Sequence, residues 1–176
     1  MYKGTMNNVK ENRAISPPTP FVKDLAKVLY GGKRFVYDFA IDMANDRYSL
    51  WKLGITHVLN AAHGRMHCQG SHSFYGSTVD YYGVPADDSP SFDLSPYFFP
   101  SAEYIQKALD TAGVLVHCAV GVSRSASLVL AYLMICHHYT LIEAINKIKE
   151  HRWIFPNIGF LKQLRALDLK LRKTSS

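Results

Sequence analysis

The chain has 176 residues, of which 48% are hydrophobic and 12% aromatic, a length and composition that fit one globular domain and exclude a disordered chain. No apolar run approaches the ~20 residues of a membrane span, and the first residues do not form the apolar core of a signal peptide. Three cysteines without paired spacing predict a reducing compartment, so we expect a cytoplasmic protein, also compatible with the nucleus. The net charge of +6 predicts acidic or phosphorylated partners. We expect no nucleic-acid or membrane partner.

Residues 1–20 are predicted to be a flexible N-terminal arm, because they carry Asn, Lys and Ser and end in the run Pro17-Pro18-Thr19-Pro20. A single folded domain is expected over residues 21–176. Its first element is a short amphipathic helix that begins at Phe21 and that Gly31-Gly32 ends.

Four stretches of apolar, aromatic and β-branched residues are predicted to be strands, and they lie near residues 35–39, 55–60, 79–84 and 114–117. A largely helical C-terminal half follows the last of them. This pattern predicts an α/β domain in which helices flank a twisted central mixed sheet. In such sheets ligands bind at the carboxyl ends of the strands.

Capping residues and apolar periodicity predict five more helices. They run from an Asn45 cap to Gly54, from Ser95 to about Thr111, over residues 128–135, from a capping box of Thr140 and Glu143 to about Lys149, and from an Asn157 cap over Gly159 to Leu171.

The segment that joins the fourth strand to the core helix carries the strongest chemical signal, because it places Cys118 directly before a loop of small residues. Such a loop can turn backbone N–H groups inward, and the helix N-terminus adds partial positive charge. A phosphate fits this cradle, and the same field favours the nucleophilic thiolate of Cys118. The guanidinium of Arg124 can grip two phosphate oxygens, and Ser125 brings a hydroxyl near the sulfur. The predicted phosphate-binding residues are Ala119, Val120, Gly121, Val122, Ser123 and Arg124.

The run His117-Cys118-x5-Arg124-Ser125 resembles the phosphate-binding loop of the cysteine-dependent protein tyrosine phosphatases, and residues 119–126 are similar to the dual-specificity branch. The resemblance covers roughly residues 43–172. Several stretches look closest to the muscle-restricted form among the atypical members: residues 59–64, 75–76, and 151–153 with 156–157. The resemblance implies a dual-specificity phosphatase fold. It also implies hydrolysis of phosphotyrosine and of phosphoserine or phosphothreonine in protein substrates through a phosphocysteine, without a metal or another cofactor.

A loop rich in aspartate, residues 85–95, supplies the second chemical feature. A carboxylic acid beside the pocket can protonate the leaving oxygen and then serve as base for the attacking water. Asp88 stands where the resemblance places this general acid, next to Asp87, whereas Asp93 is predicted to cap the following helix. The resemblance gives Asn157 a structural role only.

The chain departs from the family before Met43, where the usual first strand of the domain is not recognisable. Either residues 35–39 take its place, or the sheet lacks an edge strand. In the second case the alternative function is a phosphoprotein-binding form with weak catalysis. Protein kinases are further candidate partners, and the oligomeric state and physiological substrate stay open.

Histidines and cysteines outside the phosphate loop allow a second interpretation. His63, His67, Cys68 and His72 have the spacing of a soft metal site, but a long loop between two strands is the preferred interpretation. Cys136 is either a redox partner of Cys118 or a packing residue, and packing is preferred.

The substrate class also allows a second interpretation, hydrolysis of phosphoinositides or of RNA 5′-phosphates. It is less favoured, because the phosphate loop has no lysine and carries Ser123 where the RNA-specific members of the superfamily tend to have asparagine.

Overall fold

The computed structural model describes residues 34–37, 44–65, 70–119, 122–150 and 152–175. The predicted arm over 1–20 and the predicted helix at Phe21 lie outside these residues. The described elements are β1 (Arg34–Tyr37), α3 (Arg47–Leu53), β2 (His57–Asn60), α4 (His72–Tyr75), β3 (Asp80–Gly83), η1 (Ser95–Tyr97), α5 (Phe98–Thr111), β4 (Gly113–His117), α6 (Arg124–His137), α7 (Leu141–Lys149) and α8 (Ile158–Thr174).

The strands form one sheet in the order β1-β4-β2-β3, and every strand pair among the described residues is parallel. We predict a mixed sheet, but no antiparallel strand occurs in the described part of the chain. The parallel arrangement follows from the connections, because α4 carries the chain from β2 to β3 and α5 carries it from β3 to β4. The predicted α/β architecture is confirmed.

The strand β1 forms one edge of the sheet, where the sequence left open whether any strand is present. It covers part of the stretch 35–39 and pairs with β4 from Arg34↔Gly113 to Tyr37↔Val116. The stretch therefore takes the edge position in the described sheet, and the alternative of a missing edge strand is wrong.

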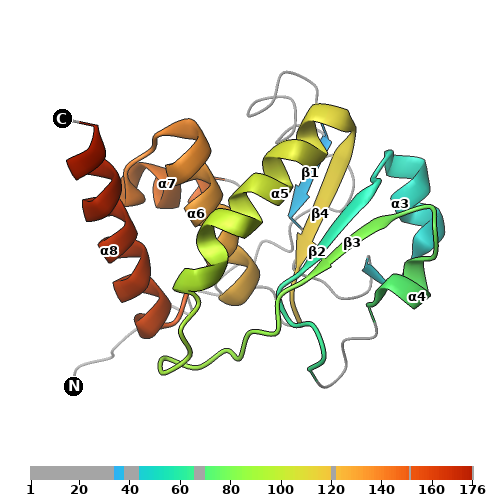
Figure 1. Cartoon of the computed structure of the whole chain (residues 1–176), viewed down its shortest axis with the longest axis horizontal. Coiled ribbons are helices and arrows are strands. Elements are labelled where there is room, and N and C mark those ends of the chain that lie inside the picture. The colour runs from blue at the N-terminus through green and yellow to red at the C-terminus, as the bar shows by residue number, and fades with distance from the viewer. Residues whose placement is uncertain (1–33, 38–43, 66–69, 120–121, 151, 176) are drawn as a thin grey trace, which may run out of the picture.

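Helices cover both faces of the sheet (Figure 1), with α5 to α8 on one side and α3 and α4 on the other. Side chains of β4 alternate between the two cores: Val114 and Val116 pack with the large helical cluster, and Leu115 packs with the small one. All five residues of β4 are buried. A strand that is buried on both faces has an uninterrupted apolar sequence, which is why its position is predictable.

Two of the predicted N-terminal helix caps are confirmed. The capping box of Thr140 and Glu143 is present, and the Asn157 side chain caps α8 by accepting a hydrogen bond from the Phe160 N–H. The cap of α3 is Asp46, which accepts from the Ser49 N–H at 3.1 Å, so the Asn45 prediction is wrong by one residue. Asparagine and aspartate both suit an N-cap, but Asp46 is the residue that directly precedes the first helical residue, Arg47.

The helix predicted from Ser95 begins instead as the short 3-10 turn η1, and α5 starts at Phe98. The side chain of Asp93 accepts hydrogen bonds from the Ser95 N–H at 3.1 Å and from the Ser95 hydroxyl at 2.6 Å. The N-cap of η1 is Leu94, which makes no side-chain cap bond, so the predicted helix cap at Asp93 is wrong. Asp93 instead closes a local turn with Ser95 and is engaged away from catalysis.

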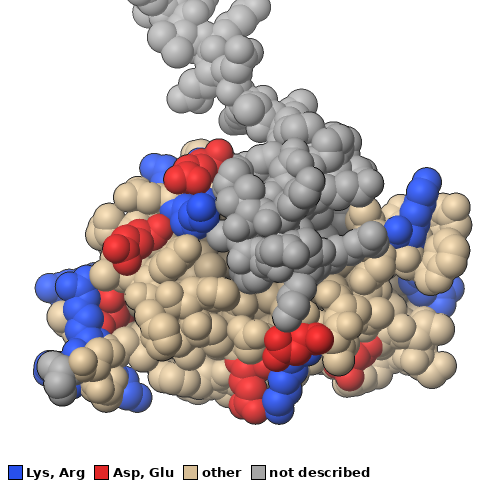
Figure 2. Space-filling view, turned by 90° about the horizontal axis from the view of Figure 1, so that it is seen from above, with Lys and Arg blue, Asp and Glu red and all other residues tan. Residues whose placement is uncertain are grey.

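Charged side chains of both signs lie near one another on the face seen in Figure 2. Two of the ion pairs are Glu103 with Lys107 at 2.8 Å on α5 and Asp168 with Arg172 at 3.0 Å on α8. On the described part of this face, basic and acidic side chains lie interspersed and do not form one basic strip. No described helix is long and apolar enough to cross a membrane.

Candidate active site

The site lies at the carboxyl edge of the parallel sheet. Cys118 directly follows β4 and is only 1% exposed, and the aspartate loop begins where β3 ends at Gly83. Because parallel strands end at the same edge, both segments emerge on one side of the domain. The backbone of β4 is fixed there by the Ala61 N–H, which donates to the His117 carbonyl at 2.7 Å.

The first turn of α6 carries two buried polar side chains, Arg124 and Ser125. The Ser125 hydroxyl lies 3.3 Å from the Cys118 sulfur, and Ser125 is fully buried. Arg124 is only 8% exposed, and its Nη1 donates to the Ala86 carbonyl at 3.1 Å. Its buried Nε–H has no hydrogen-bond partner among the residues that the structure describes. A buried guanidinium with an unpaired donor at a cysteine loop is suited to an anion that carries several oxygens.

The contact of Arg124 with Ala86 also joins the two segments of the site. Ala86 lies two residues before Asp88, so the arginine that is predicted to hold phosphate also fixes the start of the aspartate loop. Among the predicted loop residues, Ser123 is buried and Ala119 and Val122 are half-buried. Val120 and Gly121 lie outside the described residues.

The two neighbouring aspartates of the loop have different partners. Asp87 forms an ion pair with Arg65 at 3.1 Å, and Arg65 also donates to the Pro85 carbonyl at 2.6 Å. Asp88 is exposed and accepts a hydrogen bond from the Asn157 Nδ2 at 3.0 Å. Asp87 is therefore occupied by a cation outside the phosphate loop, whereas the partner of Asp88 touches that loop. This difference favours Asp88 as the acid.

Asn157 is the residue whose part in the site the sequence did not reveal. Its side-chain amide donates to Asp88, its side-chain oxygen accepts from the Phe160 N–H at 2.9 Å, and its own N–H donates to the Ser123 hydroxyl at 2.9 Å. One residue thus caps α8 and touches both the phosphate loop and the aspartate loop. The sequence signal was visible only as a helix cap, and the hydrogen bond to Asp88 extends the predicted structural role to the aspartate loop.

The start of α8 holds the rest of the aspartate loop as well. Gln163 accepts from the N–H groups of Leu94 and Ser95 at 2.7 and 3.1 Å and donates to the Phe92 carbonyl at 2.8 Å. A Cβ on Gly159 would lie 2.0 Å from the Pro90 carbonyl oxygen, so only glycine permits this approach of helix and loop. The loop that carries Asp88 is therefore positioned mainly by the last helix.

We expect Asn157→Ser and Asn157→Ala to lower kcat about 10-fold on aryl phosphates with poor leaving groups, because Asp88 loses the amide that orients it. Serine keeps a good N-cap, whereas alanine also costs about 1 kcal/mol of stability. Steady-state kinetics and thermal unfolding separate the two effects. Each variant is also made together with Asp88→Asn, where the loss should vanish. A normal rate for Asn157→Ser would show that the residue acts only as a cap.

The histidines with metal-like spacing contact an aromatic residue in the structure. His63 Nδ1 lies 2.6 Å from the Tyr81 hydroxyl, and the ring of His72 packs edge-on against Tyr81. His67 and Cys68 lie outside the described residues, so the preference for a loop over a metal site stays a prediction.

Cys136 lies near the far end of α6, about 18 Å along the helix axis from Arg124 at 1.5 Å per residue. Its sulfur faces the Ala102 carbonyl of α5 at 3.9 Å, and burial raises the pKa of its thiol. A disulfide with Cys118 would require α6 to unwind. The geometry supports a packing role.

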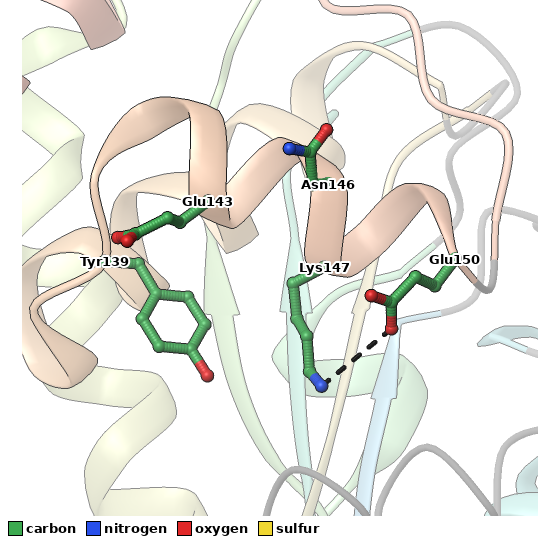
Figure 3. Close-up of a pocket in the computed structure, with 5 residues that line it drawn as sticks. All are labelled: Tyr139, Glu143, Asn146, Lys147 and Glu150. Atoms are coloured by element: carbon green, nitrogen blue, oxygen red, sulfur yellow. Dashed lines mark ion pairs between the residues drawn. The ribbon is translucent and has the colours of Figure 1, made fainter.

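A pocket of about 360 Å³ lies along α7, apart from the residues of the site (Figure 3). Lys147 pairs with Glu150 there at 3.9 Å, and the Glu143 carboxylate accepts from the Thr140 N–H at 2.8 Å in the capping box. These charged groups bond to other residues of α7 or its cap, so we assign the pocket no ligand.

A parallel sheet that ends in a buried cysteine, with an arginine and a serine at the start of the next helix, defines the class of cysteine-dependent phosphatases. The family model "Dual specificity phosphatase, catalytic domain" matches residues 42–169. The chain therefore belongs to the dual-specificity phosphatase family and is a dual-specificity protein phosphatase, as the sequence resemblance predicts.

Relatives and solved structures agree with this assignment. The chain is 49% identical over 182 residues to dual specificity protein phosphatase 26 of Rattus norvegicus, a match that covers 96% of this chain and 85% of the relative. It is 56% identical over 131 residues to dual specificity protein phosphatase 13B of Homo sapiens, covering 73% and 66% of the two chains. The finer likeness to the muscle-restricted form stays a prediction.

The crystal structure of human DUSP28 superposes with a TM-score of 0.70 at 26% identity, covering 80% of this chain and 94% of that chain. A mouse putative dual specificity phosphatase, complexed with zinc tungstate, superposes with a TM-score of 0.68 at 28% identity, covering 77% and 83% of the two chains. The fold of the family is thus shared over most of the domain.

Proposed function

We propose that this phosphatase acts through a phosphocysteine on Cys118, with Arg124 holding the phosphoryl group and Asp88 moving the proton. The observation that carries the proposal is the join of β4 and α6, where a buried cysteine lies 3.3 Å from the Ser125 hydroxyl and the buried Arg124 begins the helix. Phosphotyrosine and phosphoserine or phosphothreonine in proteins are the substrates.

In the first step the Cys118 thiolate attacks phosphorus, and the bond from phosphorus to the substrate oxygen breaks. Asp88 donates its proton to that oxygen, so the product leaves as a neutral alcohol or phenol. Arg124 and the backbone N–H groups expected in the loop stabilise the negative charge on the phosphoryl oxygens.

In the second step water attacks the phosphocysteine, and Asp88, now a carboxylate, takes a proton from that water. The bond from phosphorus to sulfur breaks, and inorganic phosphate is released. The Ser125 hydroxyl donates a hydrogen bond to the departing sulfur. Arg124 and the loop N–H groups stabilise the charge on the phosphoryl oxygens, and Ser125 stabilises the charge on the departing sulfur. These steps therefore need no metal.

Ser125→Ala tests this two-step scheme. We expect its steady-state rate to fall about 10-fold while an initial burst of close to one equivalent of product remains, because only the second step loses its donor. Rapid-quench kinetics with a phosphotyrosine and a phosphothreonine peptide measure both phases. The labelled intermediate should map to Cys118. Tight binding without any burst or turnover in the wild type would instead support the phosphoprotein-binding alternative.

Protein kinases are proposed as further partners, since they carry phosphotyrosine and phosphothreonine on accessible loops. The proposed location is the cytoplasm, with the nucleus second, because a thiolate nucleophile needs a reducing compartment.

A further inference from the structure

The segment that leads into α8 exposes large apolar side chains beside the site. Trp153 is 70% exposed and Phe155 is 66% exposed, whereas Ile154 between them is 6% exposed and Pro156 is buried. This alternation is that of an extended chain with one face in the core and one face in water. The outward face carries the two aromatic residues.

Two of the exposed residues pack together, and a third follows three positions later. The rings of Trp153 and Phe155 lie 5.8 Å apart, and Ile158 at the start of α8 is 59% exposed. We name Trp153, Phe155 and Ile158 the apolar rim. Large side chains clustered in water cost stability and solubility, so a cluster of this kind marks a binding surface more often than a single exposed residue does.

The backbone of the rim is tied to both halves of the site. The Phe155 N–H donates to the Val122 carbonyl of the phosphate loop at 2.7 Å. Asn157, which lies between Phe155 and Ile158 in sequence, donates to Ser123 and to Asp88 at 2.9 and 3.0 Å. Each rim residue is therefore within two positions of a direct contact with the catalytic segments.

We propose that the apolar rim binds large apolar side chains that flank the phosphorylated residue of the substrate. The inference rests on the proposed function, because a phosphoryl group that reaches the buried Cys118 brings its own polypeptide neighbours to the edge of the loop. An extended peptide advances about 3.3 Å per residue, so residues one to three positions from the phosphoresidue reach the adjoining surface. Because the rim is hydrogen-bonded to the phosphate loop, the substrate itself is a better candidate for this surface than a partner that binds away from the site.

Two phosphopeptides test the proposal. They share one phosphotyrosine and differ only in the flanking positions, which are leucine and phenylalanine in the first and serine in the second. For the wild type we expect kcat/KM to be about 10-fold higher for the apolar peptide, the effect of burying about one large side chain. In the double variant Trp153→Ser/Phe155→Ser the ratio should fall to about 1 to 2.

A second exposed aromatic pair supplies the matched control. Tyr48 and Trp51 on α3 are 66% and 75% exposed, with rings 6.0 Å apart, and they contact neither segment of the site in the described structure. Tyr48→Ser/Trp51→Ser should keep the wild-type ratio, which excludes a general effect of removing exposed aromatic residues.

The serine-flanked peptide reports the chemistry within each variant, so failure of the rim and failure of the phosphatase mechanism give different results. A wild-type ratio near 1, or a 10-fold ratio that survives in the rim variant, overturns the proposal. So does a dimer in sedimentation velocity that the rim variant abolishes while the ratio stays unchanged, since the occupant would then be a second copy of the chain.

Discussion

Cys118→Ser is expected to lower phosphopeptide hydrolysis by about 10⁴-fold or more. A serine hydroxyl is a much weaker nucleophile than a cysteine sulfur near neutral pH, because the hydroxyl keeps its proton. The change leaves Arg124 and its contact with Ala86 in place, so the variant should still bind phosphopeptide. Phosphate release and isothermal titration calorimetry measure the two properties separately.

Cys136→Ser is the control for this result. Cys136 packs against α5 at the far end of α6, so its replacement should leave turnover close to that of the wild type. Hydrolysis that persists in Cys118→Ser would refute the mechanism. Equal rates for wild type and Cys118→Ser, both near zero, would make the chain a binding protein.

Asp88→Asn should lower kcat about 10²-fold, because a carboxamide cannot donate the proton that the leaving oxygen needs. The loss should grow as the leaving group becomes more basic and should nearly vanish for an activated aryl phosphate. A series of aryl phosphates with phenols of graded acidity measures this dependence. The amide of Asn157 can still reach the new side chain, so the loop should hold its place.

Asp87→Asn separates the two neighbouring carboxylates. Asp87 pairs with Arg65 at the surface, so its loss should change kcat by less than about 2-fold and should show no dependence on the leaving group. If Asp87→Asn lowers kcat as much as Asp88→Asn does, the assignment of Asp88 as the general acid is wrong.

The sequence predicts the parts of the site that are local in the chain. Cys118, Arg124 and Ser125 lie within one strand–loop–helix unit, so their spacing alone brings them together, as the 3.3 Å contact of Cys118 with Ser125 shows. The capping box of Thr140 and Glu143 is equally local, and it is confirmed in full.

Contacts between distant segments were not predictable in this way. Asn157 and Asp88 are 69 positions apart, and the cap signal at Asn157 gave no hint of the second partner of its side chain. The place of β1 beside β4 is likewise a long-range pairing that the short stretch around Phe35 does not encode by itself. Local sequence signals therefore predict most helices and strands, but contacts such as that between α8 and the aspartate loop depend on tertiary packing.

The dependence of the aspartate loop on α8 has a consequence for synthesis of the protein. A nascent chain that has reached the end of α6 already contains Cys118, Arg124 and Asp88, but Asp88 lacks its hydrogen bond to Asn157 until that residue and Gln163 are made. The acid is therefore oriented toward the nucleophile only when the last helix docks. We expect the growing chain to reach full phosphatase activity only after that docking.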